Sequence, residues 1–255
     1  MIRYKTEEEI AILREGGKIH AKILKELVKK VKPGAKTSDL NSYAEKLIDE
    51  AGATAAFLGY RPKGVKRPYP VSLCVSINDE IVHGIPSHQK ILKESNIVSL
   101  DLGLKYNGMM TDSAITVSVG VVDELGMKLI RATEEALNTG IKAMKIGGHI
   151  GDIGAAVMKV AGRTGFQIAE DLSGHGVGYD VHEEPFVPNF SKAGEGPEIK
   201  PGLVIAIEPM FVEGNSAVKA LKDGYTYVTR DGKRAAHFEH TVAVTKNGVE
   251  VLTKM

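Results

Sequence analysis

Hydrophobic residues recur at helical spacing in four stretches of the chain, and this pattern predicts four helices. The first helix is expected to begin after Thr6, because Glu9 three residues later completes a capping box. The segment Lys32-Pro33-Gly34 ends this helix, since proline and glycine stop helices. The four predicted helices cover residues 7–31, 38–51, 123–144 and 150–164.

Alternating patterns and short apolar runs predict β-strands between the helices. Asn107-Gly108 separates two of them and is a strong hairpin signal, because both residues readily adopt a positive φ. The predicted strands cover residues 72–78, 96–105, 109–120, 173–182, 203–208, 225–229 and 235–245.

The order of two helices followed by strands occurs twice, in halves of about residues 1–120 and 121–255. Each half has too few strands to close a core of its own. The sequence therefore predicts a single α+β domain over residues 1–255, built from two fused halves.

Composition limits the chemistry that the chain can perform. Its 33 Lys and Arg residues nearly balance 32 Asp and Glu residues, which argues against a basic nucleic-acid surface. The one cysteine, Cys74, excludes an internal disulfide and a multi-cysteine zinc site, so any metal site must use His, Asp and Glu. Neither a signal peptide nor a membrane-spanning run is visible, and we therefore expect a cytoplasmic protein.

Asp101 and Asp112 interrupt apolar strands on the two arms of the predicted hairpin. With Asn107-Gly108 as a two-residue turn, Asp101 faces Ala114, and Asp112 shares a face with both. The two aspartates are then diagonal neighbours, with Cα atoms about 7–8 Å apart. Either they accept backbone hydrogen bonds at strand ends, or they converge on a metal ion. A three-residue turn would instead put them on opposite faces.

Three further acids or bases interrupt apolar strands in the second half, namely His175 among glycines, Glu208 before Pro209, and Glu239. Four carboxylates and one imidazole are typical of two-metal hydrolases, in which carboxylates bridge ions about 3.5–4 Å apart. Such oxygen-rich ligation suits Mn, Co, Fe(II) or Zn and does not choose among them.

Two more histidines, His83 and His182, lie next to Gly84 and Glu183 in segments flanked by proline. Each is either a structural histidine or a donor to a substrate carbonyl, and the sequence leaves both interpretations open. It assigns no role to the remaining histidines, His20, His88, His149, His237 and His240.

Seven segments, in this order, resemble the type I methionine aminopeptidases, and the resemblance runs from about Thr6 to Thr245. The segments are SINDEIVHGIP at 76–86, DLG at 101–103, TDSA at 111–114, GHGVG at 174–178, HEEP at 182–185, IEPM at 207–210 and FEHT at 238–241. The resemblance implies a pita-bread fold, with two pseudo-symmetric halves around a curved antiparallel sheet and helices on the outside.

The same resemblance implies an activity. Members of the family remove the initiator methionine from nascent proteins when the next residue is small, by attack of a water molecule that two metal ions activate. Implied partners are N-terminal Met peptides and transiently the ribosome, without DNA or a membrane, and the chain is expected to be a monomer.

The resemblance also assigns roles to individual side chains. Asp112 and Glu239 would bridge the two ions. Asp101 would bind one of these ions, and His175 and Glu208 would bind the other. His83 and His182 would hydrogen-bond the scissile amide, and Glu208 would be the general base. The implied methionine pocket consists of Tyr69, Cys74, Val181 and Tyr225.

Two features depart from the family pattern. Val181 and Tyr225 stand where the family has larger aromatic residues, which concerns the width of the pocket. The segment between Tyr60 and Tyr69 is longer than usual and basic, with Arg61, Lys63, Lys66 and Arg67. It is either a solvated loop or a contact for the nascent chain or ribosomal RNA.

Two other functions compete with this interpretation. A peptidase of the same fold that cleaves before proline usually carries an additional N-terminal domain, for which a catalytic domain beginning near Thr6 leaves no room. A catalytically inactive binding module would have lost metal ligands, whereas all five are present here. The sequence therefore favours the aminopeptidase.

Overall fold

The computed structural model describes residues 1–61 and 67–254. The four predicted helices are confirmed, and the capping box at the first one is present, because Thr6 Oγ1 accepts from the Glu9 backbone and Glu9 Oε2 accepts from the Thr6 backbone. The helices are α1 (Glu7–Val28), α2 (Thr37–Glu50), α3 (Glu124–Ala143) and α4 (Ile150–Thr164). None of them has the length and apolar character needed to cross a bilayer.

Most of the strands belong to one antiparallel sheet in the order β1-β4-β5-β14-β9-β7-β8, with β2 beside β4 and β15 beside β14. They are β1 (Thr54–Ala55), β2 (Leu73–Ile77), β4 (Ile97–Tyr106), β5 (Met109–Ser118), β7 (Ser173–Gly176), β8 (Glu183–Pro188), β9 (Val204–Ile207), β14 (Glu239–Thr245) and β15 (Gly248–Val251). Two three-stranded sheets, β13-β10-β6 and β11-β12-β3, flank it. Their strands are β3 (Glu80–Val82), β6 (Gln167–Ile168), β10 (Met210–Val212), β11 (Val218–Ala220), β12 (Tyr227–Thr229) and β13 (Ala235–His237).

The hairpin β4–β5 has the predicted two-residue turn. Asn107 and Gly108 both adopt positive φ, 45° and 86°, and the register pairs Asp101 with Ala114 and Gly103 with Asp112. The prediction that Asp101 and Asp112 share one face of the sheet is therefore confirmed.

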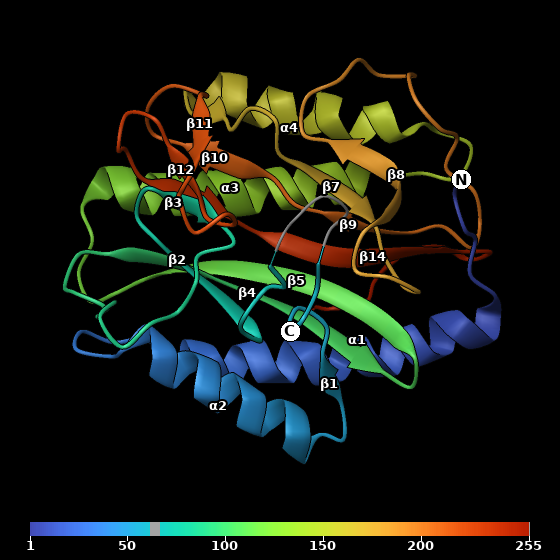
Figure 1. Cartoon of the computed structure of the whole chain (residues 1–255). Coiled ribbons are helices and arrows are strands. Elements are labelled where there is room, and N and C mark those ends of the chain that lie inside the picture. Colours follow the sequence, from blue (N-terminus) through green and yellow to red (C-terminus); the bar gives the residue numbers. More distant parts are fainter. Residues whose placement is uncertain (62–66, 255) are drawn as a thin grey trace.

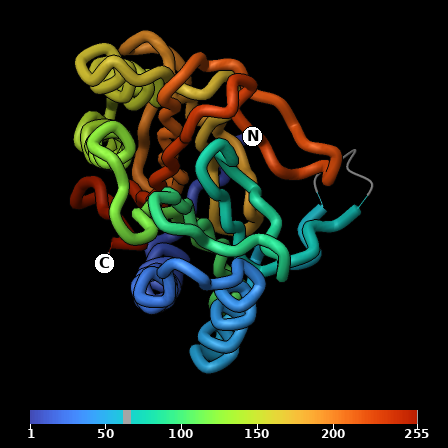
Figure 2. The backbone as a smooth tube through the Cα atoms, turned by 90° about the vertical axis from the view of Figure 1, so that its left-hand side faces the viewer, coloured from blue at the N-terminus to red at the C-terminus, as the bar shows by residue number. Residues whose placement is uncertain are grey.

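Each helix pair packs its apolar stripe on its own part of the large sheet. Leu24 and Leu27 of α1 and Leu40 of α2 form a core with strands β2 and β4. A second core joins α3 and α4 to residues of β9 and β14, such as Ile205 and Val242. Figure 1 shows α1 and α2 below the long hairpin and α3 and α4 above it. In Figure 2 the segments on either side of residues 62–66 project away from both helix pairs.

Two strand predictions are wrong in part. The predicted strand 173–182 ends at Gly176, and the chain forms a separate strand, β8, from Glu183. The predicted strand 235–245 breaks at Phe238, so that β13 joins a small sheet and β14 joins the large one. Both irregularities lie beside predicted site residues.

Candidate metal centre

Strand pairing brings the predicted metal ligands together on one face of the large sheet. Ala114 of β5 pairs with Asp101 of β4 on one side and with Glu239 of β14 on the other. Because His240 pairs with Ile207, the adjoining residues Glu239 and Glu208 stand opposite each other at the end of the β14–β9 ladder. Three carboxylates thus form one row across the strands.

A second row lies two residues along the strands and therefore on the same face. This row contains Asp112 on β5 and His175 on β7. His175 pairs with Ala206 of β9, and Ala206 pairs in turn with Thr241 of β14. The His175 Nε2 atom lies 3.3 Å from Glu208 Oε1 and 3.9 Å from Asp112 Oδ2. The structure therefore gathers all five predicted ligands, although they come from strands distant in the sequence.

Hydrogen bonds between side chains and backbone fix the backbone of Asp112 and Glu239, the two residues that carry the central carboxylates. Thr241 Oγ1 accepts a hydrogen bond from the Asp112 amide at 2.8 Å and donates one to the Asp112 carbonyl at 2.7 Å. Ser113 Oγ donates to the Glu239 carbonyl at 2.7 Å. These bonds hold strands β5 and β14 in register below the site, so the carboxylates have little freedom to separate.

Glycines allow β7 to lie close to its neighbours. A Cβ atom at Gly174 would lie 2.3 Å from the Ala206 carbonyl oxygen, and one at Gly176 would lie 2.2 Å from the Glu184 carbonyl oxygen. His175 Nδ1 lies 3.0 Å from the Gly176 carbonyl and must donate to it, which leaves Nε2 as a lone pair directed at the carboxylates. This tautomer is the one that binds metal through Nε2.

The carboxylates lack the partners that buried charges require. All four are buried, and Asp101 Oδ1, Asp112 Oδ1 and Glu239 Oε1 have no hydrogen-bond partner within the described residues. Their ion-pair partners in residues 1–61 and 67–254 are histidines, without any Lys or Arg. Unpaired buried carboxylates are costly, and divalent cations are the ions that such oxygen-rich clusters accept. The donor set therefore fits the metal ions that the sequence predicts.

Burial raises the pKa of every carboxyl group in the cluster. It raises the pKa of Asp101 to about 6 and that of Glu208 to about 7, from ordinary values of 3.8 and 4.5. The pKa values of Asp112 and Glu239 rise well above their ordinary values, first by burial and then by repulsion from the neighbouring carboxylates. Without a bound cation, the cluster retains protons that isolated carboxyl groups would lose.

These raised pKa values predict that the metal-free protein loses stability as the pH rises. A carboxyl group with a raised pKa in the folded state stabilises that state fully below its unfolded pKa. The contribution of Asp101 and Glu208 should therefore disappear between about pH 4 and pH 7. Thermal unfolding in chelator across pH 5–8 measures this loss, and Asp101→Asn/Glu208→Gln should flatten the profile. Equal slopes in the two proteins would contradict the prediction.

His83 lies half-buried beside the carboxylates in a constrained backbone conformation. Its φ of 58° is in the left-handed region, which is uncommon for residues other than glycine. The His83 carbonyl accepts a hydrogen bond from Thr226 Oγ1 at 3.2 Å. Burial lowers the pKa of the His83 imidazole to about 4, so the ring is neutral at pH 7.

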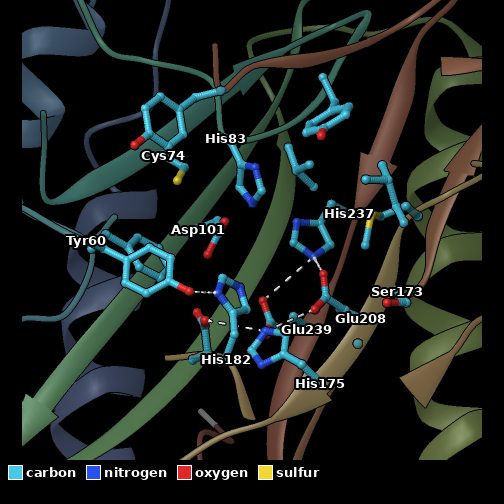
Figure 3. Close-up of a pocket in the computed structure, with 18 of the residues that line it drawn as sticks. Tyr60, Cys74, His83, Asp101, Ser173, His175, His182, Glu208, His237 and Glu239 are labelled. Atoms are coloured by element: carbon cyan, nitrogen blue, oxygen red, sulfur yellow. Dashed lines mark hydrogen bonds and ion pairs between the residues drawn. The ribbon is translucent and has the colours of Figure 1, made fainter. Parts of the chain in front are cut away.

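His182 extends from the irregular loop between β7 and β8. Its ring packs against His175, with centroids 4.3 Å apart, and its Nδ1 lies 2.6 Å from Tyr60 Oη. Glu183 anchors this loop, because its Oε2 accepts from the buried Lys5 Nζ at 2.7 Å and its Oε1 accepts from the Tyr179 amide. The N-terminal segment thus fixes the loop that carries His182. Figure 3 shows both histidines directed at the carboxylate cluster.

An apolar wall adjoins the cluster within a cavity of about 440 Å³. Tyr69 Oη donates to Cys74 Sγ at 3.1 Å, and the Tyr69 ring packs edge-on against Tyr225, 5.0 Å between centroids. Three predicted pocket residues, Tyr69, Cys74 and Tyr225, line the cavity, while Val181 is buried in the same apolar cluster without lining it. The role of Val181 in the methionine pocket stays a prediction.

Several lining residues carry no role predicted from the sequence, and three of them lie in the apolar wall or beside the predicted site residues. Phe57 belongs to the apolar wall, Tyr60 contacts His182, and His237 lies with its Nε2 3.5 Å from Glu208 Oε2. For His237 a signal existed, because it precedes Glu239 by two residues and thus shares its strand face. Phe57 and Tyr60 precede an irregular loop. In such a segment no helical or strand-like pattern of apolar residues indicates which side chains face inward.

The predicted contact of the basic segment with the ribosome stays a prediction. Lys63 and Lys66 lie outside the described residues, and only Arg61 and Arg67 of the four basic residues lie within them.

Comparisons with known proteins show the family and the fold of the chain. A model of metallopeptidase family M24 matches residues 11–246, so the chain is a member of that family of metal-dependent peptidases. The chain is 42% identical to "Methionine aminopeptidase 1" of Bacillus subtilis (strain 168), over 100% of both chains. It is 44% identical to "Methionine aminopeptidase" of Aquifex aeolicus (strain VF5), over 98% of each.

Solved structures lead to the same family. The crystal structure of methionine aminopeptidase from Thermotoga maritima superposes with a TM-score of 0.95, at 41% identity over 100% of both chains. The chain belongs to the methionine aminopeptidases, and the family that the sequence predicts is confirmed. The prolidase of Pyrococcus furiosus, at 23% identity, covers 99% of this chain and 65% of its own with a TM-score of 0.78, and it shares the fold. The predicted pita-bread fold is thereby confirmed.

Proposed function

We propose that this chain removes N-terminal methionine from peptides and nascent proteins whose second residue is small. One observation carries the proposal: five potential metal ligands share one sheet face beside an apolar, aromatic-lined cavity. The cavity can hold an unbranched thioether side chain, while the carboxylates lie where the first peptide bond would follow. We expect this reaction in the cytoplasm, where initiator methionine is exposed on new chains.

Two divalent ions, held by Asp101, Asp112, His175, Glu208 and Glu239, fit the donor set. Bound divalent ions supply Lewis acidity, which polarises a carbonyl and lowers the pKa of water toward neutrality. Asp112 and Glu239, on the paired strands β5 and β14, would help to hold the ions. Mn, Co, Fe(II) and Zn all accept such ligands, and the physiological ion is left to experiment.

The surrounding side chains would orient the peptide and move its protons. His83 is neutral at pH 7, so it can donate a hydrogen bond to the peptide bond without adding charge. Tyr60 Oη, as a donor to His182 Nδ1, leaves the His182 proton on Nε2 for the substrate carbonyl oxygen. Glu208, at the edge of the cluster, would accept a proton from the attacking water and pass it to the leaving amine.

Peptide cleavage by metal-reconstituted protein tests the proposal. Chelated protein should be inactive, and addition of Mn, Co, Fe(II) or Zn should restore release of methionine from Met-Ala-Ser. Met-Leu-Ser, with a bulky second residue, should be cleaved at least about tenfold more slowly, since even one extra methylene in a tight pocket changes the binding free energy by about 1–3 kcal/mol.

A set of Xaa-Pro peptides provides the comparison with the proline-specific enzymes that share the fold. Faster cleavage of Xaa-Pro than of Met-Ala-Ser would overturn the proposed substrate. Absence of hydrolysis with every metal would favour a binding module.

A further inference from the structure

His237 is a buried histidine that points into the carboxylate cluster, and its ring makes no hydrogen bond to the described residues. Its side chain is 2% exposed, and neither ring nitrogen has a hydrogen-bond partner within the described residues. An imidazole in this condition is costly, because its ring N–H loses the hydrogen bond it would make in water. Its backbone, in contrast, is well held, since Thr116 Oγ1 accepts from its amide and donates to its carbonyl.

The ring is directed at two carboxylates that form no ion pair with a Lys or Arg of the described residues. His237 Nε2 lies 3.5 Å from Glu208 Oε2 and 3.7 Å from Glu239 Oε2. These distances are too long for a good hydrogen bond. Figure 3 shows His237 on the opposite side of Glu208 from His175, so that one imidazole faces each oxygen of that carboxylate.

The spacing fits a shared cation better than direct contact. The ligand atoms of Glu208, His237 and Glu239 all lie within 4.8 Å of one another. Ligand atoms that are each about 2.0–2.2 Å from one ion must be separated by roughly 3–4 Å. A divalent ion among the three would therefore satisfy the His237 lone pair and two carboxylate oxygens with small movements.

We propose that His237 Nε2 is a sixth protein ligand of the metal centre, on the ion held by Glu208 and Glu239. This inference rests on the proposed metal-dependent function and deepens it. The centre then contains two imidazoles, His175 and His237, which flank Glu208. A second nitrogen ligand shifts the site toward ions that favour imidazole, such as Zn and Fe(II), relative to Mn.

The alternative is that His237 only positions Glu208 by donating a hydrogen bond to it. Glutamine separates the two roles, because its amide can donate to Glu208 but is a poor ligand for these ions. His237→Gln and His237→Ala should both weaken Zn binding by about a hundredfold or more, measured by competition with a chelating dye. A His237→Gln variant that binds Zn within about threefold of the native chain would overturn direct ligation.

Spectroscopy counts the imidazoles without relying on activity. In the His175→Ala background, pulsed EPR of one bound Mn(II) should still show imidazole nitrogen coupling, which the added His237→Gln change should abolish. Absence of coupling in His175→Ala, or its persistence in the double variant, would overturn the proposal. If His175→Ala binds no Mn(II), the Zn affinities of His237→Gln and His237→Ala decide whether His237 is a ligand.

Two controls separate failure of this inference from other failures. Metal-free His237→Gln should unfold at the temperature of the metal-free native chain, since His237 makes no side-chain hydrogen bond to lose. Native protein that binds no divalent ion would overturn the proposed function as well as the ligand. Native protein that binds ions and cleaves peptides, with His237→Gln unchanged in affinity, would overturn the ligand alone.

Discussion

Replacing Asp112 by asparagine should abolish peptide hydrolysis and weaken the binding of both metal ions. Asp112 lies at the centre of the ligand set, and its Oδ1 has no protein partner in the described part of the chain. Breaking a buried charge pair costs about 3–5 kcal/mol, and about 1.4 kcal/mol corresponds to a tenfold change in affinity. We therefore expect metal affinity to fall by roughly a thousandfold, measured by calorimetry, and kcat/KM to fall at least as much.

The stability of the metal-free protein gives an independent check on Asp112→Asn. Burial, and then repulsion from Asp101 and Glu208, raises the pKa of Asp112, so the metal-free protein retains a proton there. The uncharged asparagine should therefore not lower the unfolding temperature in chelator. The increase in unfolding temperature on adding metal should instead disappear. Asp39→Asn, an exposed change on α2, should leave the increase in unfolding temperature on adding metal unaltered. Near-normal activity of Asp112→Asn with added Mn or Co would contradict the two-metal account.

The hairpin explains why half of the site could be predicted from the sequence. Asn107-Gly108 fixes a two-residue turn, the turn fixes the register, and the register puts Asp101 and Asp112 on one face. Each step is local, so neighbouring residues determine it. The row from Ala114 to Glu239 and Glu208 requires pairing of β5 with β14, about 125 residues apart, and of β14 with β9, about 33 residues apart, which no local pattern reports.

Two missed features have identifiable physical causes. Strand β8 contains Pro185 and Pro188, which argue against a strand, but β8 lies at the edge of the sheet, where a missing N–H is tolerated. The break at Phe238 lies within an apolar run that reads as one continuous strand. Because of this break, His237 leaves the large sheet while its side chain stays directed at Glu239. For His83 and His182 the sequence left a structural role and a substrate-contacting role open, and only the resemblance to a family chose between them.

Replacing His83 or His182 by alanine should lower kcat without changing the number of bound metal ions. Both imidazoles line the cavity beside the carboxylates, and neither belongs to the candidate ligand groups found among the described residues. Loss of one hydrogen bond to the developing oxyanion costs about 10²–10³-fold in kcat. The loss should appear mainly in kcat, with KM changed by less than about threefold, in Met-Ala-Ser cleavage. Metal analysis of the same samples should find native stoichiometry.

Tyr60→Phe distinguishes a hydrogen-bond role of His182 from a packing role. The phenylalanine retains the ring contact with His182 but removes the hydroxyl that lies 2.6 Å from its Nδ1. It should therefore lower kcat by about tenfold, the effect expected from about 1.4 kcal/mol of lost orientation. His88→Ala, an exposed histidine on the loop after β3, should have native kinetics. Loss of a metal ion in His83→Ala or His182→Ala would show instead that the altered histidine is a ligand, and the assignment of substrate contacts would fail.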